Sequence, residues 1–271
     1  MIAIAALLAA SLAASGAPPL EYLGPKLPAQ VQRVVTLAPS LTDTVVALGA
    51  GERLVGVSRF DELPQVKALP RVGGYMDPSV EAVIALHPQL VLVQPAPGNR
   101  QPVMKLAQLG VSVLSLPMTS VADTLAAIRE VARALGVPKR GEALARGIQK
   151  TRAELRARAQ KLPHPRVLFV YGFEPLVVAG PGSFAAELLT DAGGRNAALG
   201  ARSAYPVYSV ERVLEDRPEL VIDASDSNGG ERLKRLLPGT RWVRLKGQAM
   251  LHPGPSLEAG LRQLFQILHP D

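Results

Sequence analysis

The sequence predicts an α/β fold of two lobes with parallel sheets, joined by a single long helix. Three observations indicate this arrangement. First, short β-branched apolar runs alternate with helical segments in both halves of the chain, as in parallel sheets that helices cover on both faces. Second, a stretch of the first half recurs 130 residues later in the second half. Third, a basic segment with helical apolar spacing, residues 138–162, separates the two halves.

The first lobe is expected over residues 33–137. It opens on the buried strand RVVTL, and the helix after that strand has a glycine stop at Gly49. The last helix of the lobe begins after Ser120, whose side chain suits an N-cap, and ends at Gly136. Four strands are predicted in this lobe, at residues 33–37, 53–57, 90–93 and 111–116.

The second lobe, residues 163–271, repeats this plan. Its opening strand is RVLFVY, and its first helix, FAAELLTDAGG, follows a turn in which Ser183 caps the helix. The clearest sign of the repeat is a pair of gapless stretches. Ser79–Val93 reads SVEAVIALHPQLVLV, and Ser209–Asp223 reads SVERVLEDRPELVID, with seven of fifteen positions identical. A period this long indicates two equivalent lobes and not a solenoid.

The segment between the lobes is predicted to be one connecting helix over residues 138–162. A helix of about 24 residues is about 36 Å long, which is enough to run across both lobes. Its narrow apolar stripe steps by three and four residues, at Leu144, Ile148, Thr151, Leu155, Ala159 and Leu162.

The net charge of the chain is concentrated on this helix. The whole sequence holds 30 Lys+Arg against 23 Asp+Glu, a net charge of +7, and residues 138–162 alone hold eight basic and two acidic residues. The rest of the protein is therefore close to neutral, which excludes a general nucleic-acid footprint. We interpret the basic side of the helix as a solvated face, because Arg stems commonly cover apolar surface on exposed helices.

The N-terminal segment has the pattern of an export signal. Residues 1–17, MIAIAALLAASLAASGA, form an uncharged apolar run that ends in small residues and is too short to span a membrane. The usual Lys or Arg before such a run is missing. A Pro-rich leader, residues 18–32, follows. Because the chain has no cysteine, we expect an exported protein with no disulfide and no lipid anchor.

No constellation for catalysis or for a resident metal is visible. The sequence has no HExxH, GxSxG or GxxxxGK[ST] motif, and no GxGxxG follows the first strand. The four histidines each precede a proline and none has a partner at metal-ligand spacing; they are His87, His164, His252 and His269. We therefore expect a protein that is not an enzyme.

The repeated stretch places one glutamate at the same position of each lobe. Glu81 and Glu211 each lie two residues after a serine that caps a helix. The helix dipole favours an acid there, but it does not require the same acid in both lobes. A matched pair of carboxylates suits docking onto a two-fold partner that offers one basic pocket to each lobe.

Several motifs together resemble a known family. They are RVVTLAPSLTDTVVALGAGERLVGVS, PRVGGYMDPSVEAVIALHPQLVLV, LAQLGVSVL and YPVYSVERVLEDRPELVI, together with the long connecting helix. They resemble the helical-backbone (class III) substrate-binding proteins of ABC importers, which carry cobalamin, haem or iron–siderophores. The resemblance covers most of the chain, from about Arg33 to Leu268. The resemblance implies two Rossmann-like lobes joined by a rigid helix with little hinge motion. It also implies a periplasmic monomer that holds its ligand in the interlobe cleft and docks onto the permease dimer through Glu81 and Glu211.

The nearest likeness is to the cobalamin-binding type, in which aromatic residues from loops of both lobes hold the corrinoid. The resemblance implies a ligand site made by Phe60, Tyr75, Gln94, Phe173, Tyr205, Gln248 and His252. The cobalamin binders use tryptophans in these loops, whereas the single Trp242 of this chain lies outside them. Tyr and Phe can substitute, because an aromatic ring supplies a large contact area at low entropic cost.

Other ligands and another class of function stay open. For haem, Tyr75 is the candidate iron ligand, and Arg59 or Arg100 could face the propionates. A ferric siderophore is the third choice, because anionic chelates usually need several arginines in the cleft. A ligand-sensing module that is not coupled to transport could use the same fold.

Overall fold

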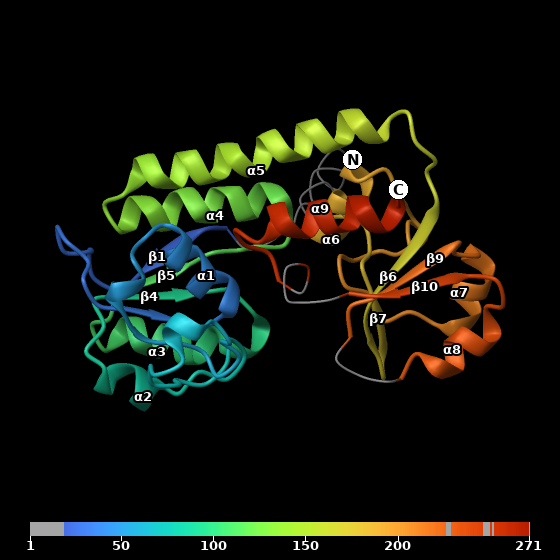
Figure 1. Cartoon of the computed structure of the whole chain (residues 1–271). Coiled ribbons are helices and arrows are strands. Elements are labelled where there is room, and N and C mark those ends of the chain that lie inside the picture. Colours follow the sequence, from blue (N-terminus) through green and yellow to red (C-terminus); the bar gives the residue numbers. More distant parts are fainter. Residues whose placement is uncertain (1–18, 226–228, 246–249, 251, 271) are drawn as a thin grey trace, which may run out of the picture.

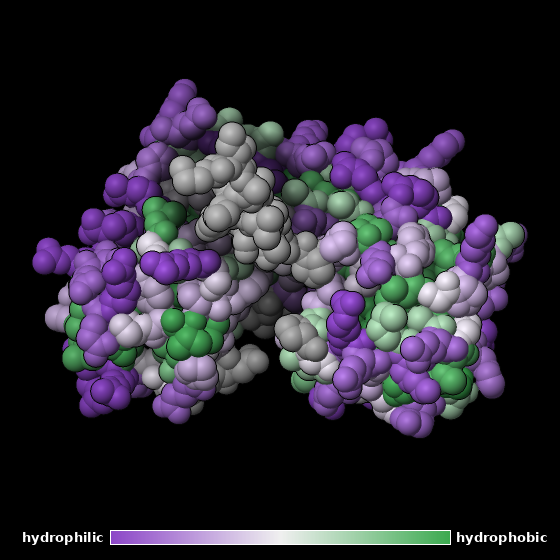
Figure 2. All heavy atoms as spheres, turned by 180° about the vertical axis from the view of Figure 1, so that it is seen from behind, coloured by the Kyte–Doolittle hydropathy of each residue, from purple (hydrophilic) through white to green (hydrophobic). Residues whose placement is uncertain are grey.

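The computed structural model describes residues 19–225, 229–245, 250 and 252–270. Two lobes lie side by side, and one long helix, α5, crosses above both of them (Figure 1). Seen from behind, a notch that opens at the lower edge separates the lobes (Figure 2). Within the described ranges, no helix is both long and apolar enough to cross a membrane. The predicted signal segment, residues 1–17, and Gln248 lie outside these ranges.

The N-terminal lobe is built on a five-stranded sheet with the order β1-β5-β4-β2-β3. Strands β2, β3, β4 and β5 run parallel to one another, and β1 pairs antiparallel with β5 at one edge of the sheet. β1 falls within the predicted leader, where too few apolar residues alternate to indicate a strand. The strands are β1 (Glu21–Leu23), β2 (Val34–Thr36), β3 (Leu54–Gly56), β4 (Leu90–Val93) and β5 (Val113–Ser115).

Helices cover both faces of this sheet, as the apolar strands predict. Alternate strand residues point to opposite sides: Val34 packs toward α1 and α4, whereas Val35 packs toward α2 and α3. The serine cap expected for α4 is present, because the Ser120 hydroxyl accepts a hydrogen bond from the Asp123 N–H at 3.0 Å. The helical segments are α1 (Pro39–Ala47), η1 (Gly51–Arg53), η2 (Pro64–Val66), α2 (Val80–Ala85), η3 (Pro97–Asn99), α3 (Arg100–Gln108) and α4 (Val121–Ala134).

The C-terminal lobe has a second sheet, with the order β10-β9-β6-β7 and β8 paired to β6. β8, β9 and β10 run parallel to their neighbours, whereas β7 is antiparallel to β6. The strands are β6 (Arg166–Phe173), β7 (Leu176–Val178), β8 (Arg195–Asn196), β9 (Leu220–Asp223) and β10 (Arg241–Arg244). The helices are α6 (Phe184–Asp191), α7 (Val210–Asp216), α8 (Glu231–Leu236) and α9 (Leu257–Leu268).

The sequence repeat corresponds to the same unit in both lobes. Its first copy forms α2 and β4, and its second copy forms α7 and β9. Ser79 and Ser209 cap α2 and α7, each accepting a backbone N–H three residues on at 3.2 Å. His87 and Arg217, the repeat-equivalent residues before the two prolines, both have a left-handed backbone, with φ of 44° and 47°. The predicted α/β fold of two equivalent lobes is confirmed.

The connecting helix α5 spans Pro138–Ala159 and ends three residues before Leu162. Along it, one hydrophobic core combines residues of α4 from the first lobe with residues of α6, α9, β6 and β9 from the second. Its residues Gly141, Ala145, Ile148, Thr151, Leu155 and Ala159 are buried. A shared core of this kind joins the two lobes without a flexible linker.

The basic side of α5 is more than a solvated face. Arg152 and Arg156 both bind the fully buried Asp191 of α6, with the Arg156 Nε 2.8 Å from its Oδ1. Arg140 donates to the Leu48 carbonyl oxygen in the first lobe at 3.1 Å. Arginines of α5 therefore attach the helix to both lobes. The interpretation as a purely solvated face is wrong for them, because acceptors from distant parts of the chain could not be located in the sequence.

Candidate functional site

A cavity of about 480 Å³ lies between the two lobes. It opens beyond the carboxyl ends of β2, β4 and β5 in the first lobe and beside Tyr171, near the carboxyl end of β6, in the second. This is the usual position of ligand sites in parallel sheets. Its lining residues are Ala38, Pro39, Ser40, Tyr75, Gln94, Pro95, Pro117, Met118, Thr119, Tyr171, Phe184, Tyr205, His252 and Pro253. The structure thus brings together Tyr75, Gln94, Tyr205 and His252 of the predicted ligand residues.

Two phenol rings enter the cavity from opposite lobes. Tyr75 and Tyr205 hold the same position in the sequence repeat, and they are 39% and 42% exposed. Burial raises the pKa of Tyr205, and the nearby Tyr75 phenol raises this pKa further. Both side chains are partly exposed and line the cavity, one from each lobe.

Tyr171 is a wall residue that the sequence analysis did not single out. Its ring meets the edge of the Tyr205 ring, with 5.6 Å between the ring centroids, and packs against Phe169 at 5.0 Å. Its hydroxyl is buried and has no hydrogen-bond partner among the described residues. Burial raises the pKa of this phenol well above its usual value, with a further contribution from Tyr205, so the hydroxyl keeps its proton at neutral pH.

The polar groups of the cavity wall are neutral. The Gln94 amide donates to the Ser40 hydroxyl at 2.7 Å. Burial lowers the pKa of His252, which favours the neutral imidazole, and its Nδ1 has no partner within the described part of the chain. None of the described lining residues is an acid, a lysine or an arginine. The wall therefore suits a ligand that offers amides, hydroxyls and apolar surface more than one with several negative charges.

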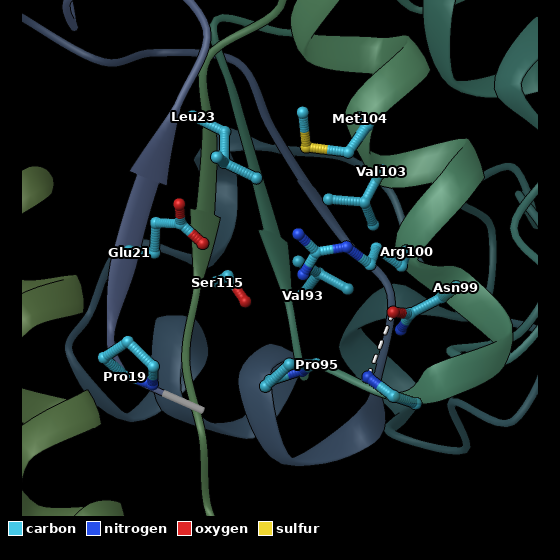
Figure 3. A pocket seen from close by; sticks show the side chains of 11 residues that line it. Pro19, Glu21, Leu23, Val93, Pro95, Asn99, Arg100, Val103, Met104 and Ser115 are labelled. Carbon is cyan, nitrogen blue, oxygen red and sulfur yellow. Dashed lines mark hydrogen bonds between the residues drawn. The ribbon is translucent and has the colours of Figure 1, made fainter. Parts of the chain in front are cut away.

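The two arginines considered for haem propionates lie elsewhere. The Arg59 guanidinium pairs with Asp77 and lies 5.1 Å from the centroid of the Phe60 ring. Arg100 lines a second cavity of about 300 Å³, between β1 and α3 in the first lobe (Figure 3). Neither arginine is part of the wall of the interlobe cavity.

Two predicted ligand residues also lie away from this wall. Phe60 is about half exposed, and its ring packs against Gly74 beside the Tyr75 loop. Phe173 stacks on Trp242, with 6.5 Å between the ring centroids. The pairing register of β6 with β7 shifts between Val170 and Gly172, and this shift places Phe173 with the core of the opposite sheet face.

The floor of the cavity is a direct contact between the lobes. The Phe184 N–H donates to the Thr119 carbonyl oxygen at 2.9 Å. The Glu187 carboxylate of α6 accepts a hydrogen bond from the N–H of Val121, the first residue of α4, at 3.2 Å. It also forms an ion pair with Arg152 of α5. Hydrogen bonds thus connect both lobes and α5 at the floor of the interlobe cavity.

The two repeated glutamates are accessible. Glu81 and Glu211 lie in the first turns of α2 and α7, and both side chains are exposed. α2 and α7 cover the sheet faces that point away from α5 (Figure 1). Neither glutamate forms an ion pair with a described residue. Hydrogen bonds from its own backbone and from Ser209 hold the pKa of Glu211 below its usual value, so its carboxylate is charged.

Comparison with known proteins places the chain in a family. Residues 34–243 match the family described as periplasmic binding protein. The chain belongs to the periplasmic binding protein family. Members of this family bind ligands without transforming them, deliver them to ABC transporter permeases, and work in the periplasm.

Individual relatives narrow the comparison to one class of the family. The vitamin B12-binding protein of Vibrio vulnificus is 30% identical over 192 residues, which are 70% of each chain. A periplasmic haem-binding protein of Pseudomonas aeruginosa is 31% identical, with a TM-score of 0.76 and coverage of 89% of this chain and 94% of that chain. The periplasmic vitamin B12-binding protein BtuF of Vibrio cholerae shares the fold at 23% identity, with a TM-score of 0.75 and coverage of 88% and 96%. The helical-backbone class expected from the sequence is confirmed.

Proposed function

We propose that the protein binds a corrinoid such as cobalamin in the interlobe cavity and delivers it to an ABC importer. The observation that carries this proposal is the wall itself: phenol rings from both lobes, neutral polar groups and no charged side chain among the described lining residues. A corrinoid has an apolar ring face and a periphery of neutral amides. Such a ligand matches aromatic contacts and hydrogen bonds without burying unpaired charges.

A direct titration tests the choice of ligand. Purified protein is titrated in parallel with cyanocobalamin, haemin and a ferric siderophore, and binding is followed by absorbance and calorimetry. The proposal expects one cyanocobalamin per chain and weaker binding of the two anionic ligands. Saturable binding of haemin without binding of cyanocobalamin would refute the choice of corrinoid.

Haem is the second candidate, because Tyr75 supplies an accessible phenol at the cavity. A tyrosine can bind ferric haem iron, and the Pseudomonas aeruginosa relative is a haem-binding protein. If haem is the ligand, the absorbance spectrum of the haemin complex should show tyrosine-ligated iron, and Tyr75→Phe should abolish that spectrum. Tyr205→Phe is the matched control, since it removes the same atom from the repeat-equivalent residue.

Glu81 and Glu211 are proposed to dock the protein onto its permease. Support comes from their exposure, their lack of ion pairs with described residues and their equivalent positions on the two lobes. Glu81→Ala combined with Glu211→Ala should abolish ligand uptake by intact cells and leave ligand affinity unchanged. Loss of ligand affinity in this variant would instead assign the pair to the binding site. Glu52→Ala with Glu215→Ala, two other exposed acids, serves as control.

A further inference from the structure

The segment from Gln94 to Asn99 separates two cavities. On one side, Gln94 and Pro95 line the interlobe cavity. On the other side, Pro95, Ala96 and Asn99 line the second cavity of about 300 Å³ (Figure 3). A wall with a cavity behind it lacks packed side chains on that side. Its position therefore depends on hydrogen bonds more than on packing.

Asn99 supplies these hydrogen bonds. Its side-chain Nδ2 donates to the Gln94 carbonyl oxygen at 2.7 Å and to the Tyr75 carbonyl oxygen at 2.6 Å. Its Oδ1 accepts from the Ala96 N–H at 3.0 Å, the bond drawn in Figure 3. Asn99 is only 2% exposed, so no solvent can replace these partners. Both amide hydrogens and one oxygen lone pair are used.

The bond to Tyr75 connects two loops that are far apart in the sequence. Tyr75 precedes α2, whereas Asn99 precedes α3. The loops also touch at Gly98, where a Cβ atom would lie 3.0 Å from the Met76 Cε. One buried side chain thus fixes the backbone of Tyr75 and of Gln94, two of the residues that the first lobe presents to the interlobe cavity.

We infer that Asn99 is a positioning residue of the ligand site, which sets where Tyr75 and Gln94 stand in the cleft. This inference rests on the proposed ligand site in the interlobe cavity. Asn99 is absent from the wall of that cavity, so it acts through its two neighbours. A displacement of either loop removes contacts that the ligand needs in fixed places.

Two substitutions test the inference with cyanocobalamin as the probe. Asn99→Ala removes all three bonds and should weaken binding by about tenfold or more. Asn99→Asp keeps the acceptor for the Ala96 N–H, but it replaces the donor amide with a carboxylate oxygen that repels the carbonyl oxygens of Tyr75 and Gln94. It should therefore weaken binding further than Asn99→Ala. The matched control is Asn196→Ala, because the buried Asn196 also bonds a carbonyl oxygen and an N–H, those of Ala179 and Ala198, in the other lobe. This control should lose thermal stability and keep its affinity.

A mutant cycle separates positioning from general destabilisation. In a chain that carries Tyr75→Ala and Gln94→Ala, Asn99→Ala should cause little further loss of affinity, because the residues it positions are gone. Wild-type affinity in the Asn99 variants, an equal loss in the Asn196 control, or fully additive losses in the cycle would overturn the inference. Wild-type affinity in the Tyr75→Ala, Gln94→Ala chain would instead refute the ligand site itself.

Discussion

The hydroxyl of Tyr171 lowers the stability of the folded protein. The atom is buried and has no hydrogen-bond partner among the described residues. Leaving such a group unsatisfied costs about 1–3 kcal/mol. Tyr171→Phe removes the oxygen and keeps the ring contacts with Phe169 and Tyr205. We therefore expect the variant to be more stable than the wild type, by about 1 kcal/mol at the lower end of that range.

Thermal and urea unfolding measure this effect. For a chain of this size, 1 kcal/mol corresponds to a rise in Tm of about 2–4 °C. Tyr208→Phe is the control with the opposite sign, because the Tyr208 hydroxyl donates to the Asp216 carboxylate at 2.5 Å in the same lobe. That variant should lose about 1 kcal/mol. If Tyr171→Phe were no more stable than the wild type, the hydroxyl would have a partner and the reasoning about the cavity wall would fail.

Two further predictions concern the carboxyl groups of the buried Asp191 and the partly buried Asp43. Asp191→Ala should lower the free energy of unfolding by about 2 kcal/mol in urea titrations, because it removes the buried carboxylate that binds Arg152 and Arg156, while Arg152 keeps its contact with Glu187. The exposed Glu215→Ala should cost less than about 0.5 kcal/mol, and equal losses would contradict the assignment. Burial and the nearby charge of Asp61 raise the pKa of Asp43 to about 6, so the folded protein loses stability as the pH rises from about 4, where the unfolded carboxyl ionises, through 6. Asp43→Asn should therefore be more stable than the wild type by about 2 kcal/mol at pH 7.5, and a gain that persisted at pH 4 would refute this explanation.

The architecture could be predicted because its signals are local or repeated. Ser79 and Ser209 show their capping role through spacing alone, and the duplicated stretch identifies the same helix and strand in each lobe. The length of α5 follows from its apolar stripe. The partners of its arginines could not be predicted, because Asp191 meets Arg152 only through the packing of α6 on α5.

Part of the candidate ligand site could also be predicted, because two of its residues recur in the sequence repeat. Tyr75 and Tyr205 stand out because they recur in the repeat, and both line the cavity. A signal for Tyr171 existed: it shares its side of β6 with the buried Phe169 and lies toward the carboxyl end of that strand, where ligands bind. The sequence gives no sign of the register shift that turns Phe173 away from the cavity.

The central claim is that phenol rings from both lobes hold a corrinoid in one cavity. Calorimetric titration of cyanocobalamin into the wild type and into a variant with Tyr75→Ala and Tyr205→Ala tests it most directly. The claim predicts one tight site in the wild type and an affinity at least about a hundredfold lower in the variant, since truncating an interface aromatic commonly costs about 2 kcal/mol or more. No binding to the wild type, or equal affinity in both proteins, would contradict it.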